Sequence, residues 1–67
     1  MDTVIVRMEH CRRLRYCAGG VRELFQRYNL NYMDFLQNGI PGEDLLKATN
    51  NDAMVIAVVE VARGRKP

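Results

Sequence analysis

The stretch that decides the fold is residues 53–63, AMVIAVVEVAR, in which nine of the ten positions from Ala53 to Ala62 are apolar. So many β-branched residues also suit a buried strand. The run is eleven residues long, however, follows the capping cluster Asn-Asn-Asp at 50–52 and ends on Arg63, where a cation suits a helix C-terminus. We therefore predict a helix. Because it is apolar nearly all round, it must be the central helix of the domain or part of a dimer interface.

The clearest amphipathic segment lies upstream, from about Ala18 to Tyr28. Its apolar residues recur at helical spacing, i, i+3, i+4 and i+7, and charged or polar residues occupy the other face. A turn follows, in which Asn29 suits the left-handed conformation and Asn31 suits an N-cap. We expect two helices joined by a three-residue corner.

The middle of the chain predicts two more short helices. Tyr32, Phe35 and Leu36 mark the first, which Asn38-Gly39 closes, with Ile40 making the hydrophobic contact of a Schellman-type stop. Pro41 suits the first position of the second, which carries acids in its first turn and fades by Thr49.

The N-terminal part gives weaker signals. Residues 3–6, TVIV, predict an extended arm, and pairing of this arm with a second copy of the chain is left open. Residues 7–16 show a weak helical period, which we expect Gly19-Gly20 to break or cap.

Together these segments predict an all-α single domain over residues 1–67, a bundle of four to five short helices with an extended arm at 1–6 and a frayed basic tail at 64–67. The predicted core is Val21, Leu24, Phe25, Tyr28, Leu30, Phe35, Leu36, Ile40, Leu45, Leu46, Val55, Val58, Val59 and Ala62.

Size and composition exclude several classes of protein. Sixty-seven residues with 48% hydrophobic content and a net charge of +2 suit one small globular domain and exclude a multi-domain enzyme. The longest apolar run, Ala53 to Val59, falls far short of the roughly 20 residues of a membrane span. We expect no signal peptide, and therefore free thiols at Cys11 and Cys17 in a reducing compartment.

Residues suited to catalysis or metal binding are few. The chain has one histidine and no serine, so it holds no Ser-His-Asp set. His10 beside Cys11 suggests a metal corner, but no CxxC or HxxxH spacing supports one. The glycine pairs match no phosphate-binding loop. We expect a non-enzymatic protein with no catalytic residue, no metal and no cofactor.

Charge is unevenly distributed along the chain. Residues 1–28 carry six arginines against three acids, and residues 29–62 carry one lysine against five acids. Such a basic half can contact a nucleic-acid backbone, or an acidic half of the same or another chain, or solvent alone. The candidate contact residues for nucleic acid or a partner are Arg12, Arg13, Arg15, Arg22 and Arg27.

Residues 21–36 also have the proportions of a helix-turn-helix. The second helix would then lie in the major groove of DNA. It contains no Arg or Lys, and Asp34 would face the phosphates unfavourably, so the pattern favours a plain helical corner.

Three segments resemble a known family. They are Cys17-Ala18-Gly19-Gly20-Val21-Arg22-x-x-Phe25, then Asn29-Leu30-x-Tyr32-x-Asp34-Phe35-Leu36-x-Asn38-Gly39-Ile40, then Asn51-Asp52-Ala53-Met54. The chain is similar here to small uncharacterised proteins of tailed bacteriophages and prophages of proteobacteria. It departs from them by Asn29 and Asn51 in place of glycine and by Tyr32 in place of tryptophan. The resemblance implies a phage or prophage origin and a bacterial host cytoplasm, and it transfers no site residue.

The leading hypothesis from the sequence is a non-enzymatic interaction module that contacts a phage or host protein, or a second copy of itself, in virion assembly or host takeover. It depends on the apolar last helix, which has more hydrophobic surface than so short a chain is expected to cover. The alternative is a small, helix-turn-helix-like protein that binds nucleic acid through its arginine-rich face. No membrane partner is expected.

Overall fold

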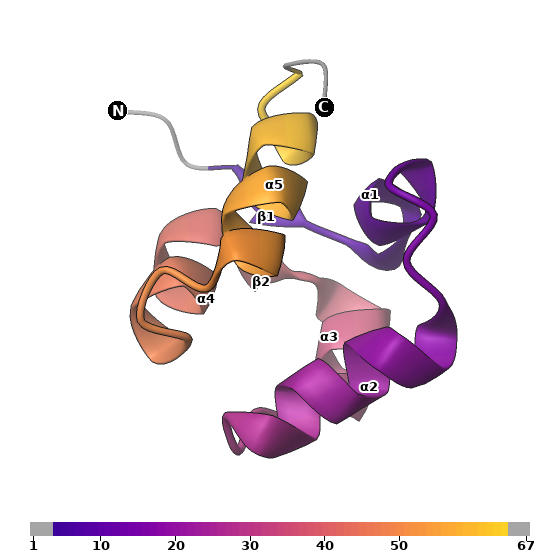
Figure 1. Ribbon diagram of the computed structural model, residues 1–67, viewed down its shortest axis with the longest axis vertical. Coiled ribbons are helices and arrows are strands. Elements are labelled where there is room, and N and C mark those ends of the chain that lie inside the picture. Colours follow the sequence, from indigo (N-terminus) through magenta and orange to yellow (C-terminus); the bar gives the residue numbers. More distant parts are fainter. Residues whose placement is uncertain (1–3, 65–67) are drawn as a thin grey trace.

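The last element, α5 (Ala53–Ala62), is a helix, as predicted, and four of its ten residues are buried. A computed structural model describes residues 4–64, which form five helices and two strands of two residues each. Figure 1 shows α5 in front of β1, with α1 to one side and α4 to the other. Asp52 caps α5 by accepting a hydrogen bond from the Met54 N–H at 2.9 Å.

The rest of the chain covers most of the surface of α5 but not all of it. Its buried residues are Val55, Val58, Val59 and Val61. Met54 and Ile56, on other sides of the helix, stay exposed. Val61 is buried where the sequence pattern favoured Ala62, which is half-buried, because a helix that is apolar all round does not specify which residues face inward.

The N-terminal arm pairs within its own chain. Strand β1 (Ile5–Val6) runs antiparallel to β2 (Ile40–Pro41), with Ile5 opposite Pro41 and Val6 opposite Ile40. Val6 is fully buried against the core, although we had not predicted it as a core residue. Residues 1–3 of the predicted arm and 65–67 of the predicted tail lie outside the described residues.

Helix α1 (Met8–Arg13) is shorter than the predicted span 7–16. His10 caps it by accepting the Arg7 N–H at Nδ1, at 2.9 Å. The helix ends because Arg15 takes the left-handed conformation, with φ 62°. The prediction that Gly19-Gly20 ends this helix was therefore wrong: both glycines lie in the first turn of α2 (Ala18–Arg27).

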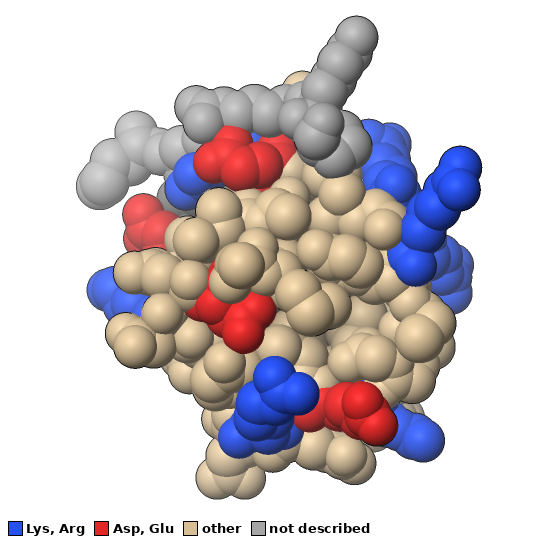
Figure 2. Space-filling model, viewed as in Figure 1, with Lys and Arg blue, Asp and Glu red and all other residues tan. Residues whose placement is uncertain are grey.

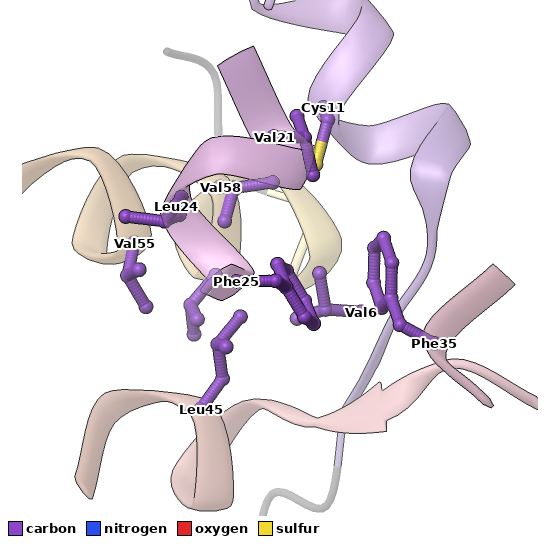
Figure 3. Packing of buried hydrophobic residues seen from close by; sticks show 10 residues of the cluster. Val6, Cys11, Val21, Leu24, Phe25, Phe35, Leu45, Val55 and Val58 are labelled. Carbon is purple, nitrogen blue, oxygen red and sulfur yellow. The ribbon is translucent and has the colours of Figure 1, made fainter. Parts of the chain in front are cut away.

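Helices α2 and α3 (Tyr32–Asn38) join at the predicted corner. Asn29 is left-handed, with φ 59°, and Asn31 caps α3 by accepting the Asp34 N–H at 2.9 Å. Phe25 packs on Phe35 with ring centroids 4.6 Å apart, and Figure 3 shows this pair beside Val6. The corner is therefore fixed by caps and by aromatic packing.

The exit of α3 differs from the predicted Schellman stop. Gly39 is the C-cap itself, with φ 75° and ψ −175°, and the chain continues directly into β2. A Cβ here would lie 2.6 Å from Ile5 Cγ2 and 2.9 Å from the Val6 carbonyl oxygen. Pro41 precedes α4 (Gly42–Ala48) as its N-cap and is not its first residue.

Most of the predicted core is buried or half-buried, and the molecule measures 26 × 24 × 22 Å. Leu36 is the one clear error, because it lies on the exposed side of α3. Apart from two glycines, Gly39 and Gly42, the buried residues missing from the predicted core are Val6, Cys11, Thr49 and Val61. The hydroxyl of Thr49 donates to the Leu45 carbonyl at 2.8 Å, which satisfies the polar group in the interior.

Candidate interaction surfaces

The five candidate arginines are all exposed. Arg12 and Arg13 lie in the last turn of α1, Arg15 follows it, and Arg22 and Arg27 lie on α2. In Figure 2, blue side chains gather along the right-hand edge, where Figure 1 places α1, and others are scattered around the rim. Arg12, Arg13 and Arg15 are sequence neighbours at the end of α1, and we call these three the arginine cluster.

None of these five arginines forms an ion pair within residues 4–64. In that range a salt bridge joins Arg63 to Glu60, with N and O atoms 3.7 Å apart. The basic and acidic halves of the sequence therefore do not neutralise each other through these side chains in one molecule. An external partner or solvent is left to meet their charge.

Arg22 and Arg27 lie on different sides of α2. The separation of five residues between them corresponds to a rotation of about 140° around the helix axis. Arg27 is next to Tyr28, and Tyr28 contacts the start of α5 through Asp52. Arg22 is one turn before Phe25, and Phe25 packs on α3. The two side chains therefore do not extend one continuous basic track along α2.

Helix α3 has the wrong surface for a recognition helix. It has no Arg or Lys, and it exposes the large apolar side chains of Met33 and Leu36. Asp34 accepts a hydrogen bond from the Asn38 side chain at 2.8 Å, which holds its carboxylate on this exposed helix. Phosphate neutralisation dominates DNA affinity, so α3 is poorly suited to enter a major groove.

Arg15 occupies a position that glycine usually fills. The Tyr16 N–H donates to the Cys11 carbonyl at 3.1 Å and the Arg15 N–H donates to the Arg12 carbonyl at 2.9 Å, which is the bonding of a Schellman motif. Asn29 and Asn50 hold the same position after α2 and α4. A residue with a Cβ there costs about 1–2 kcal/mol, and asparagine offsets part of this through local hydrogen bonds. Arginine does not, so the fold retains Arg15 at a cost in stability.

Two tyrosines bind the first turn of α5. Tyr16 Oη donates to the Met54 carbonyl at 3.3 Å, and Tyr28 Oη donates to Asp52 Oδ2 at 2.9 Å. Burial raises the pKa of Tyr16, with the nearby Cys11 and Asp52 adding to the shift. The hydrogen bond to Asp52, followed by desolvation, raises the pKa of Tyr28. The Tyr16 hydroxyl therefore joins the segment after α1 to the backbone of α5 at Met54.

Four large apolar side chains remain exposed. Their exposed fractions are Met33 62%, Leu36 43%, Met54 39% and Ile56 43%. They fall on two helices, α3 and α5, in pairs. Figure 2 shows an uncharged area on one face between α5 and α1, with acidic side chains near both ends of α5. The sequence analysis did not single out Met33, Met54 or Ile56, although Met33 is out of phase with the buried Phe35 on α3.

The groups that suggested chemistry are in structural roles. Cys11 is buried, and burial raises the pKa of its thiol to about 11. Cys17 Sγ accepts the Gly20 N–H at 3.2 Å and caps α2, while His10 caps α1. Among residues 4–64 there is no pocket and no group of three or more His, Cys, Asp or Glu side chains placed to hold a metal ion. None of the helices in this range is both long and apolar enough to cross a bilayer.

Searches with this chain find no matching family model, no matching curated protein and no matching solved structure.

Proposed function

We propose that this chain is a non-enzymatic interaction module that works by contact with another protein, either a phage or host protein or a second copy of itself. The observation that carries the proposal is the exposure of Met33, Leu36, Met54 and Ile56 on a domain that otherwise buries a well-formed core. Met33 and Leu36 lie three residues apart on one side of α3, whereas Met54 and Ile56 lie two residues apart and leave α5 on different sides. Neighbouring exposed apolar side chains such as Met33 and Leu36 are typical of binding surfaces, because apolar area there is removed from water on association.

We infer the setting from the sequence. The resemblance to tailed-phage and prophage proteins, which covers most of the chain from about Met8 to Arg63, supports an origin in such a genome and action in the bacterial host cytoplasm, in virion assembly or host takeover. The positions of neighbouring genes test this setting. Head or tail genes beside this one support assembly, and early genes support host takeover.

Site-specific photo-crosslinking tests the contact itself. A photoreactive amino acid is placed at position 33, 36, 54 or 56 of the full chain in its bacterial host, and at the exposed Lys47 of α4 as the matched control. We expect a discrete protein adduct from at least one apolar position and none from Lys47. Light scattering at micromolar concentration tells a self-adduct from a foreign partner. No adduct at any apolar position, together with a strict monomer, would contradict the proposal.

Nucleic-acid binding is the second candidate, and one observation favours it. The five arginines are exposed and have no acid partner among residues 4–64. A titration of mixed-sequence duplex DNA and of RNA, at two salt concentrations, tests it. If each of the five arginines contacts one phosphate, raising the salt from 50 to 200 mM should weaken binding by about 10²–10³-fold. Absence of binding at the lower concentration rejects this candidate.

A further inference from the structure

We propose that one surface of the molecule docks an acidic segment of another protein that carries an apolar anchor. This surface, the α1-exit surface, consists of the arginine cluster together with Tyr16 and Met54. The inference rests on the proposed function, since it assigns a location and a partner chemistry to the same interaction module.

The geometry joins a basic edge to an apolar spot. Arg15 directly precedes Tyr16, whose hydroxyl is bound to the Met54 carbonyl at 3.3 Å. Helix α1 packs on α5 through the buried Cys11, which lies in the same core cluster as Val58. Figure 2 shows the uncharged area between α5 and α1 next to the blue edge beside α1. A partner that covers Met54 and Tyr16 therefore meets the arginines at its rim.

Charge complementarity identifies the partner as acidic. Arg12, Arg13 and Arg15 have no ion pair among residues 4–64. Two acids lie near this surface: the exposed Glu9, one turn before Arg12 and Arg13 on α1, and Asp52, which accepts from Tyr28 and from the Met54 N–H. Neither forms an ion pair with the three arginines among residues 4–64. Carboxylates supplied by a partner would pair with the arginines and steer its approach.

The backbone at Arg15 supplies an independent argument. A left-handed residue with a Cβ costs stability, and such costs concentrate at functional sites, where the side chain serves a purpose other than folding. A cation near the end of α1 also interacts favourably with the helix dipole, and this is the competing explanation. Replacing Arg15 by glycine distinguishes the functional explanation from the helix-dipole explanation, because glycine relieves the backbone strain and removes the side chain.

A protein partner fits these observations better than a nucleic acid. Arginine, tyrosine and methionine are enriched in protein interfaces, around an apolar centre with a polar rim. A phosphate backbone needs a continuous track of cations, and Arg22 and Arg27 leave α2 on different flanks.

An unbiased selection tests the proposal. A random-peptide display library is selected against the full chain, and the enriched peptides are titrated into labelled protein while amide chemical shifts are recorded. We expect enriched peptides that are net acidic with at least one large apolar residue, and shifts centred on residues 12–16 and 53–57. Neutral or basic peptides, or shifts centred on α3 or α4, would overturn the proposal.

Two matched pairs of variants sharpen the test. Arg15→Gly should weaken peptide binding by at least about fivefold while its urea midpoint stays equal or rises, and Asn29→Gly, at the same left-handed position after α2, should leave affinity within about twofold. Met54→Ser should weaken binding by a similar factor, and the more exposed Met33→Ser should not. Equal affinities of the two glycine variants would overturn the proposal, and the midpoints exclude unfolding as the cause.

The results that would overturn this inference differ from those that would overturn the proposed function. Duplex DNA that binds the same amides more tightly than the peptides, with a steep loss on adding salt, would overturn the inference in favour of nucleic acid. Protein adducts from position 33 or 36, with no peptides selected at the α1-exit surface, would overturn the inference and leave the interaction module standing.

Discussion

Gly39→Ala should come close to unfolding the chain. The new Cβ would lie 2.6 Å from Ile5 Cγ2 and 2.9 Å from the Val6 carbonyl oxygen, at a φ of 75°. A backbone at φ 75° and ψ −175°, which essentially only glycine adopts, costs alanine about 1–3 kcal/mol, and overpacking a filled site costs about 1–3 kcal/mol more. Their sum, about 2–6 kcal/mol, is comparable to the roughly 3–5 kcal/mol that a core of this size supplies.

Urea unfolding followed by circular dichroism measures this loss. Gly19→Ala is the matched control, because a Cβ there meets nothing within 4 Å and the residue is helical. Alanine at position 19 should raise the free energy of unfolding by about 0.5–1 kcal/mol. If Gly39→Ala unfolds at the wild-type midpoint, then the close approach of β1 to β2 at Gly39 is wrong, and with it the seating of the arm.

Three further predictions concern single groups. Asp52→Ala should lower the free energy of unfolding by about 1 kcal/mol, since α5 loses its N-cap, and thermal unfolding would record a lower midpoint. Thr49→Val keeps the shape but removes the hydroxyl bond to the Leu45 carbonyl, for a loss of about 1 kcal/mol in urea unfolding. A pKa near 11 for Cys11, raised by burial from 9.0, means that the unfolded chain loses this proton first. Stability from this group is therefore complete below about pH 9 and declines toward pH 11, a decline that Cys11→Ala should reduce in pH-dependent urea titrations.

The helices were largely predictable because their signals are local. Asn31 and Asp52 cap helices as the sequence indicates, and the spacing of Val21, Leu24 and Phe25 identified the inward face of α2. Capping and periodicity involve residues within one or two turns of each other. A reading of short windows therefore captures them.

What was missed depends on tertiary contacts. Val6 is buried because β1 meets β2, which is 34 positions later, and no local pattern reports that pairing. Leu36 was assigned to the core because it follows Phe35, but it turns outward on α3. The early end of α1 follows from a left-handed arginine, a residue type that carries no turn signal.

Only part of the candidate surface could be predicted from the sequence. The arginines are evident from composition, but their division between the end of α1 and two flanks of α2 requires coordinates. Met54 and Tyr16 carry no motif at all. The hydrogen bond that joins them spans 38 positions of sequence.

The contact of β1 and α1 with α5 has a consequence for the order of events during translation. The ribosome releases β1 first, yet the core cluster to which Val6 and Cys11 belong is complete only when Val58 and Val59 have been synthesised. Contacts between such distant parts of a chain increase the mean length of the loops that must close during folding. We therefore expect this chain to fold more slowly than helical proteins of equal length whose contacts are mostly local in sequence. Until α5 emerges, the nascent chain lacks four buried core residues, Val55, Val58, Val59 and Val61, and stopped-flow refolding would show a single cooperative phase without an early N-terminal intermediate.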